Sequence, residues 1–438
     1  MSLLAYPSRA AGAIDVLVIG AGHAGLAMSY FLSRARVDHV VLERGEVANS
    51  WRRERWDSLR LLTPNWQTRL PGKAYAGDDP DGFMAIPELV DTLDNYAAEI
   101  AAPVQTQTDV LEVRPADQGY RVVTNRGTWQ ARSVVLATGA CNRPCVPKLA
   151  ADLPEAITQL TPFDYRSPAD VPKGGVLIVG ASATGLQLAR ELLEAGRDVT
   201  LAAGEHVRMP RRYRGKDIFH WLTETGLHDE RYDQIDDLSR GRRLPSPQLV
   251  GADDLPILDL NHIRRRGGRI TGRLMGVRDT AFQFSGSLNN VCALADLKMQ
   301  RLLKLIDETA DASGAPAGEA FPPTLVDEAA ALTLDYRQQN IRSVIWATGF
   351  RPNYDWLDVP VLDRKGQLKH DGGVVAAPGL YALGLPLLRR RKSSFIYGIE
   401  DDARDLSEHL INYLNTMRRE SDGFYRDHSG RRRYRRSA

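Results

Sequence analysis

The chain has 438 residues, of which 43% are apolar and 26% charged, and its formal net charge is +2 at pH 7. This composition is typical of a globular protein with a large core and enough length for two or three domains. The longest apolar runs are far shorter than the ~20 residues that cross a bilayer, and the first residues lack a signal peptide's apolar stretch, so we expect a cytoplasmic protein with no membrane partner. Cys141, Cys145 and Cys292 are too few for a disulfide framework, and the C-x3-C spacing argues against a dithiol reductase.

The first predicted element is a buried parallel strand, DVLVIG at 15–20, followed by glycines in the order G-x-G-x-x-G. Such glycines allow a tight turn, the approach of a pyrophosphate and close packing of the next helix, whose N-terminus then faces the phosphates. A second strand, HVVLER, ends at Glu43, where an acid binds ribose hydroxyls. We expect a dinucleotide site rather than a structural turn, formed by Gly20, Gly22, His23, Ala24, Gly25, Glu43 and Arg44.

The same plan recurs at 176–201, where the glycine turn comprises Gly180, Ser182, Ala183, Thr184 and Gly185. The next strand ends at Ala202 and Ala203, so the ribose-binding acid is missing, and Arg208 and Arg211 follow. An arginine near this position suits a 2'-phosphate and favours NADP over NAD. NAD is favoured instead if Glu205 occupies the strand end, and an arginine-rich loop can also be a solvated surface.

Two dinucleotide sites indicate one bound and one diffusible redox cofactor. The acid-bearing first site suits FAD, and the second suits NADPH. Two later strands end in the letters ATG, in VVLATG (134–139) and VIWATGFRP (344–352). Either could be a plain strand end, but together they indicate flexible turns where the backbone approaches a ligand, at Thr138, Gly139, Thr348 and Gly349.

Residues 205–310 are the expected specificity region. Apolar spacing predicts one helix in DIFHWLTETGL and another in DLKMQRLLKLIDETA, with Leu297, Leu302, Leu305 and Ile306 as its core-facing stripe. The arginine-rich tail is expected to be disordered and solubilising rather than a nucleic-acid contact. The nine histidines are too scattered to indicate a metal site.

Two further segments are SWRRERWDSLRLLTP (50–64) and PGLYALGL (378–385). Together with the glycine turns and the A-T-G strands, they make the chain resemble the class B flavoprotein monooxygenases over roughly residues 14–412. This family includes flavin-containing, Baeyer-Villiger and N-hydroxylating monooxygenases, and the chain looks most like a bacterial branch of it. The resemblance implies an α/β fold with two Rossmann-like domains: an FAD domain at 12–168 and 350–415, and an NAD(P)H domain at 169–349. It leaves 416–438 as a basic tail.

The resemblance also implies that Trp51 packs on the flavin region, although it could be an ordinary core aromatic. Asp57 to Thr63 would pass near the isoalloxazine, which makes Asp57 and Thr63 the candidate catalytic residues. Leu62 stands where relatives carry Asn or His near flavin C4a, and Gly384 lies in the closing strand-to-helix turn. Ser393 or Ser394 could cap that last helix.

The family chemistry is hydride transfer from NADPH to FAD, reaction with molecular oxygen to a flavin C4a-(hydro)peroxide, and oxygen transfer to a small organic substrate. The family fingerprint F-x-G-x-x-x-H, however, aligns with Glu155, Ile157 and Thr161 and is lost. We therefore expect a monooxygenase and retain two alternatives. One is an NAD(P)H-dependent flavoprotein reductase without oxygen transfer, and the other is a nucleotide-sensing protein.

Overall fold

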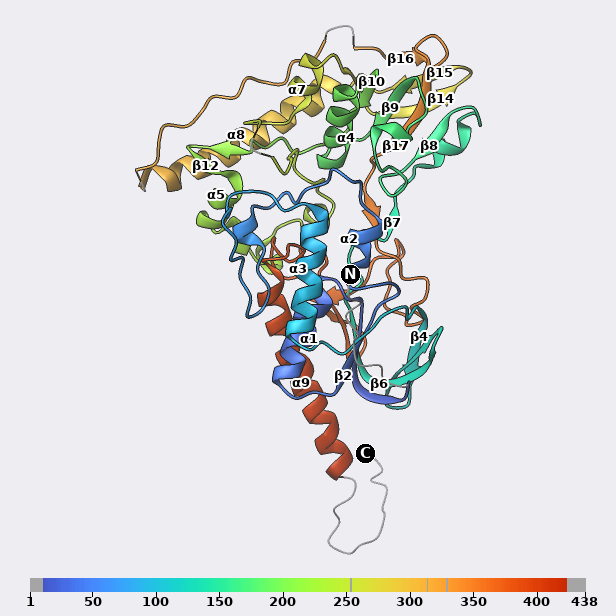
Figure 1. The fold of residues 1–438 in the computed structure, drawn as a ribbon, viewed down its shortest axis with the longest axis vertical. Coiled ribbons are helices and arrows are strands. Elements are labelled where there is room, and N and C mark those ends of the chain that lie inside the picture. The colour runs from blue at the N-terminus through green and yellow to red at the C-terminus, as the bar shows by residue number, and fades with distance from the viewer. Residues whose placement is uncertain (1–10, 253, 313, 328–329, 424–438) are drawn as a thin grey trace, which may run out of the picture.

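The computed structural model describes residues 11–252, 254–312, 314–327 and 330–423. Two sheet-containing units lie end to end along the long axis, the first at the bottom of Figure 1 and the second at the top. The long last helix leaves the first unit at its lower end. This mixed α/β arrangement, with one sheet that has a parallel centre and one that is wholly parallel, is the predicted fold class.

The first unit is built on a nine-stranded sheet in the order β19-β20-β21-β6-β1-β2-β3, with β4 and β5 beside β6. Strands β1, β2, β3, β6 and β21 are parallel neighbours, and β1 is buried at six of its seven residues, as expected of a strand covered on both faces. The strands are β1 (Ala13–Ile19), β2 (His39–Leu42), β3 (Val104–Gln105), β4 (Val110–Ala116), β5 (Gly119–Thr124), β6 (Gly127–Leu136), β19 (His370–Asp371), β20 (Val374–Val375) and β21 (Leu380–Ala382).

Helices cover this sheet and bring the chain to its carboxyl edge. Helix α1 begins directly after Gly22 and packs on both β2 and α9. In α3 the Glu88 carboxylate accepts the backbone N–H of Ala85 at 2.8 Å, which caps the first turn. These helices are α1 (His23–Arg34), α2 (Asn49–Arg53), η1 (Asn65–Gln67), α3 (Ile86–Glu99) and α9 (Ile399–Gly423).

The second unit has a five-stranded parallel sheet in the order β13-β10-β9-β17-β8. Its elements are η2 (Lys148–Asp152), β8 (Thr158–Leu160), η3 (Pro168–Asp170), β9 (Gly175–Val179), α4 (Ala183–Glu194), β10 (Val199–Ala202), α7 (Leu260–Arg265), β13 (Arg269–Thr271) and β17 (Ile341–Trp346). A small antiparallel sheet, β14 (Leu274–Arg278), β15 (Ala281–Phe284) and β16 (Thr333–Asp335), adjoins it. Because β8 pairs with β17, the second unit begins before the expected boundary at residue 168.

The chain crosses between the units twice, and the two crossings touch. Strand β7 (Arg143–Pro144) pairs antiparallel with β18 (Phe350–Arg351), which follows the second A-T-G turn. Phe163 stacks on Phe350 with ring centroids 5.0 Å apart. The crossings therefore lie near residues 145 and 350.

The segment from 205 to 310 contains both predicted helices. Its elements are β11 (Arg212–Tyr213), β12 (Lys216–Asp217), α5 (Ile218–Glu224), η4 (Leu227–Asp229), η5 (Tyr232–Gln234), α6 (Leu238–Gly241) and α8 (Leu288–Ala312). The predicted stripe on α8 was wrong in part, because Leu297 and Leu305 are 42% and 38% exposed. Met299, Leu303 and Ile306 form the buried face instead, since one turn of helix separates them and they pack on α5 and its neighbours.

The C-terminal boundary at residue 416 was also wrong. Helix α9 continues to Gly423, and Arg418 Nη2 lies 2.6 Å from Asp15 Oδ2 of β1. The rest of the expected tail, 424–438, lies outside the described residues. Among the helices that are described, none is both long and apolar enough to cross a bilayer.

Candidate active site

The first glycine turn is tightly packed at two of its three glycines and open at the third. Gly20 has φ +106°, and a Cβ there would lie 2.6 Å from the carbonyl oxygen of Ala137. A Cβ on Gly25 would lie 1.8 Å from the carbonyl oxygen of Gly20. At Gly22, by contrast, a Cβ would meet nothing within 4 Å. Gly20 and Gly25 therefore hold strand and helix together, while Gly22 leaves room in front of the helix N-terminus.

Glu43 follows β2 and turns back to this glycine turn. Its Oε2 accepts the backbone N–H of Ala21 at 2.8 Å and its Oε1 accepts that of Gly45 at 3.2 Å. The side chain is only 7% exposed, and burial raises the pKa of its carboxyl, while these two hydrogen bonds oppose the shift. The carboxylate is thereby fixed at the end of the strand, where a ribose would be bound.

A cavity of about 670 Å³ opens at this edge of the sheet. Ten residues predicted from the sequence line it: Gly20, Gly22, His23, Ala24, Glu43, Arg44, Trp51, Thr138, Gly139 and Gly384. The first A-T-G turn thus lies beside the first glycine turn, as expected from the packing of Gly20 on Ala137. The cavity also has walls that sequence reasoning missed, among them Ser50, Arg55, Thr108, Asn142, Ser246 and Trp356.

The cavity has features that fit a dinucleotide. His23 Nε2 is buried without a hydrogen-bond partner, and burial lowers the pKa of His23 to about 4, so the ring is neutral at pH 7. Gly139 has φ +73° and open space where a Cβ would stand. An elongated ligand that offers hydrogen-bonding groups along the glycine turns would satisfy these positions.

Trp51 forms part of the wall with a cation above it. The guanidinium carbon of Arg55 lies 5.0 Å from the Trp51 ring centroid and 5.9 Å from that of Phe163. Trp56, five residues further, is 6% exposed and packs in the core of the second unit. The segment 50–64 therefore supplies both a cavity wall and a contact between the units.

The candidate catalytic residues lie away from this lining. Asp57 is exposed and donates its backbone N–H to the carbonyl oxygen of Arg166. Thr63 is 8% exposed, and Leu62 packs against the segment 205–310, called the inserted segment below. Of the described residues that line the cavity, none is Asp57, Leu62 or Thr63, so the structure does not bring these three to it.

The second glycine turn repeats the packing of the first. Gly180 has φ +114°, and a Cβ there would lie 2.2 Å from the carbonyl oxygen of Ala347. A Cβ on Gly185 would lie 1.9 Å from the carbonyl oxygen of Gly180. Ser182, Ala183 and Thr184 form the start of α4. Thr348 and Gly349 follow Ala347, and Gly349 accepts the backbone N–H of Cys145 at 2.8 Å.

One segment that the sequence did not single out connects the two turns. Ser246 lines the cavity, and Gln248 Nε2 donates to the carbonyl oxygen of Ala181, in the second glycine turn, at 2.8 Å. Gln248 is fully buried and its Oε1 has no hydrogen-bond partner. This segment has no periodic pattern and no motif, which is why only the structure reveals it.

The two arginines predicted to bind a phosphate, Arg208 and Arg211, form buried ion pairs instead. Arg208 is buried between Asp259 and Asp296, with N–O distances of 2.6 and 2.8 Å. Arg211 is also buried and donates to Asp217 Oδ1 and to the carbonyl oxygen of Leu62, each at 2.7 Å. Both guanidinium groups are therefore structural, because desolvated charges need such partners. The prediction that Arg208 and Arg211 bind a nucleotide phosphate beside the second glycine turn was therefore wrong.

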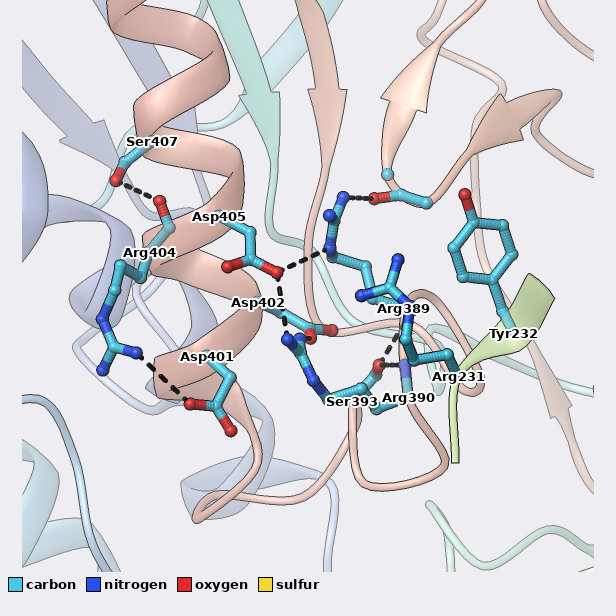
Figure 2. A network of polar contacts seen from close by, with 12 residues as sticks. Arg231, Tyr232, Arg389, Arg390, Ser393, Asp401, Asp402, Arg404, Asp405 and Ser407 are labelled. Carbon is cyan, nitrogen blue, oxygen red and sulfur yellow. Dashed lines mark hydrogen bonds and ion pairs between the residues drawn. The ribbon is translucent and has the colours of Figure 1, made fainter. Parts of the chain in front are cut away.

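Pro386 and Ser394 line the cavity, and the polar network of Figure 2 ties the segment between them to α9. Arg390 contacts Asp402 at 2.7 Å and Asp405 at 3.1 Å. Ser393 Oγ accepts the backbone N–H groups of Arg389 and Arg390. The predicted capping role for Ser393 or Ser394 was wrong, because α9 begins at Ile399.

The cysteines of the chain differ in their surroundings. Cys141 lines the cavity, Cys145 is partly buried and Cys292 is buried, and the three are free thiols. In the part of the chain that the structure describes, no group of three or more His, Cys, Asp or Glu side chains could hold a metal ion.

Comparison with known proteins agrees with this architecture. The pyridine nucleotide-disulphide oxidoreductase family matches residues 17–224. An uncharacterized CzcO-like oxidoreductase of Geobacillus kaustophilus is 32% identical over 406 residues, which cover 91% of this chain and 99% of the relative. The indole-3-pyruvate monooxygenase YUCCA8 of Oryza sativa is 31% identical over 218 residues, 46% of this chain and 51% of that protein.

Among solved structures, a flavin-containing monooxygenase from Stenotrophomonas maltophilia has the same fold, with a TM-score of 0.64, 22% identity and coverage of 92% of this chain and 99% of that one. The chain therefore belongs to the CzcO-like oxidoreductases, and it is an oxidoreductase.

Proposed function

We propose that this protein is an FAD-dependent, NADPH-using monooxygenase that oxygenates a small organic molecule. The observation that carries the proposal is the repeated glycine-turn packing, Gly20 on Ala137 and Gly180 on Ala347, with a cavity of about 670 Å³ at the first copy. Two turns of this kind serve two nucleotides, one for each redox partner.

The first site has the residues that FAD requires. Gly20, Gly22 and the N-terminus of α1 would hold the pyrophosphate, and Glu43 would bind the ribose. Trp51 and the turn at Thr138 and Gly139 would form walls for the rest of the molecule. The FAD supplies hydride acceptance from NADPH and the reaction with molecular oxygen.

The chain itself would bind the two cofactors, orient them relative to each other and exclude water from the site. Segment 246–250 supports this role, because Ser246 lines the cavity while Gln248 holds Ala181 of the second turn. The second glycine turn would hold the nicotinamide nucleotide, so a segment that contacts both turns would help to orient the two cofactors relative to each other. The names of two relatives, a flavin-containing monooxygenase and an indole-3-pyruvate monooxygenase, support oxygenation as the outcome.

A reductase without oxygen transfer is the second candidate, and the residues at the lost family fingerprint favour it. Ile157 is buried in the apolar core of the second unit, and Glu155 is exposed. Thr161 Oγ1 donates to Asp164 Oδ2 at 2.8 Å. At the fingerprint positions, Ile157 and Thr161 thus make local structural contacts and Glu155 faces solvent.

Anaerobic reduction of the purified flavoprotein by NADPH, followed by rapid mixing with oxygenated buffer, tests the proposal. We expect rapid bleaching of the flavin and then a transient absorbance band at shorter wavelength than that of oxidised flavin. Direct return to the oxidised spectrum, with and without a panel of small organic substrates, would favour the reductase. Failure of reduction by both NADPH and NADH would contradict both candidates.

A further inference from the structure

The two glycine units are equivalent residue by residue at the ends of their strands. In the first, the N–H of Gly20 donates to the carbonyl oxygen of Leu42 at 2.8 Å, and Glu43 follows. In the second, the N–H of Gly180 donates to the carbonyl oxygen of Ala202 at 3.0 Å, and Ala203 follows. Ala203 is therefore the counterpart of Glu43, and the second unit has no carboxylate where a ribose 2'-hydroxyl would be bound.

Glu205 lies two residues beyond Ala203 and forms an ion pair with a lysine. Lys298 of α8 places its Nζ 3.1 Å from Glu205 Oε1. His206 Nδ1 donates to the carbonyl oxygen of Gly204 at 2.9 Å, which fixes the turn between them. The negative charge of Glu205 is thus compensated, so an anion near this turn would meet less repulsion.

A different arginine reaches the same edge from the neighbouring strand. Strands β10 and β13 are parallel, with Ala202 opposite Thr271, and the N–H of Ala203 donates to the carbonyl oxygen of Thr271 at 3.0 Å. Continuing this register places Arg273 beside Gly204. A Cβ on Gly204 would lie 4.0 Å from both Cγ and Cδ of Arg273, so the aliphatic part of Arg273 lies against this turn.

The guanidinium of Arg273 is not in a buried ion pair of the kind that Arg208 and Arg211 form. Arg273 is exposed, and no ion pair joins it to another of the residues that the structure describes. A planar guanidinium binds a phosphate through two parallel hydrogen bonds. Gly204, without a side chain, leaves the space in front of it clear.

We propose that Arg273 binds the 2'-phosphate of NADPH and sets the preference for NADPH over NADH. The inference rests on the proposed function, in which the second unit binds the nicotinamide nucleotide. The 2'-phosphate would then bind just beyond the end of β13, where Arg273 lies, while Arg208 and Arg211 keep structural roles.

Isothermal titration of the oxidised flavoprotein with NADP⁺ and with NAD⁺ tests the inference without turnover. The wild-type protein should bind NADP⁺ more tightly than NAD⁺. Arg273→Ala should raise the Kd for NADP⁺ roughly 10- to 100-fold, the range for a hydrogen bond to a charged group, and leave the Kd for NAD⁺ within about twofold. Arg273→Lys should retain part of the preference, because it keeps the charge but loses the paired geometry.

Arg269→Ala is the matched control. Arg269 lies at the opposite end of β13 and donates to Gln339 Oε1 at 2.8 Å, so both Kd values should stay unchanged. If wild type prefers NADP⁺ and Arg273→Ala keeps that preference, the inference is wrong and the proposed function stands. Equal weakening of both nucleotides in Arg273→Ala, or equal wild-type affinities, would also overturn it. If wild type binds neither nucleotide, the proposed function itself fails.

Discussion

Arg211 and Leu62 join the inserted segment to the segment that walls the cavity: Arg211 Nη1 donates to the carbonyl oxygen of Leu62 at 2.7 Å, while Nη2 contacts Asp217. The guanidinium carbon also lies 4.8 Å from the Phe83 ring centroid and 5.3 Å from that of Phe219. One buried cation thus holds contacts from both units.

Replacement of Arg211 by Met should therefore destabilise the fold. It leaves Asp217 and the carbonyl of Leu62 without this donor, and loss of one member of a buried ion pair lowers the free energy of unfolding by about 3–5 kcal/mol. Urea denaturation followed by circular dichroism measures the change. Arg212→Met, at the exposed neighbouring position, should change stability by at most about 1 kcal/mol, the limit for an exposed ion pair, and a similar loss in both variants would contradict the role of Arg211.

Gly22 and Gly25 should respond differently to substitution, although both belong to one motif. Because a Cβ at Gly22 would meet nothing within 4 Å, Gly22→Ala should fold and keep its flavin, and Gly22→Trp should fold but lose it by filling the cavity. Gly25→Ala should lose stability, since its Cβ would lie 1.8 Å from the Gly20 carbonyl oxygen. Flavin absorbance per protein and thermal melting distinguish these effects. A yellow, folded Gly22→Trp protein would refute the FAD site.

The glycine turns could be predicted from the sequence because their packing is local: Gly20 and Gly25, or Gly180 and Gly185, meet within one strand-turn-helix unit. The partners of Arg208 and Arg211 could not be predicted in this way. For Arg208, Asp259 and Asp296 lie 51 and 88 residues further along the chain. Gln248 reaches the second glycine turn, and Arg273 reaches the turn at Gly204, from segments without a motif. Their roles depend on strand order and loop path, which spacing along the chain does not encode.

Stability should fall in mild acid, in part because of His228. Burial lowers the pKa of His228 to about 4 from its ordinary value of 6.5. Between these values the unfolded chain takes up a proton that the folded protein refuses, so stability is complete above pH 6.5 and is lost as the pH falls toward 4. In His228→Gln the slope of unfolding free energy against pH should be smaller by up to about 1.4 kcal/mol per unit. Urea titrations at pH 5 and pH 7.5 measure it, and an unchanged slope would contradict the assignment.

Arg390 should support the cavity through Asp402, its partner in Figure 2. Asp402 is fully buried, and burial raises the pKa of its carboxyl while Arg390 opposes the shift. Arg390→Met should remove about 3–5 kcal/mol of stability at neutral pH, with less loss in acid, because a protonated Asp402 needs no cation.

Arg404→Met is the control for Arg390. Its side chain is 45% exposed and pairs with Glu400 at 2.8 Å, and such surface pairs contribute at most about 1 kcal/mol. The double variant Arg390→Met with Asp402→Leu should recover much of the stability, since it removes the buried charge together with its partner. Pro386 and Ser394 line the cavity, and the network holds the segment between them, so Arg390→Met should also release flavin at a lower temperature than Arg404→Met. Equal flavin release in the two variants would mean that the network stabilises α9 without positioning the cavity wall.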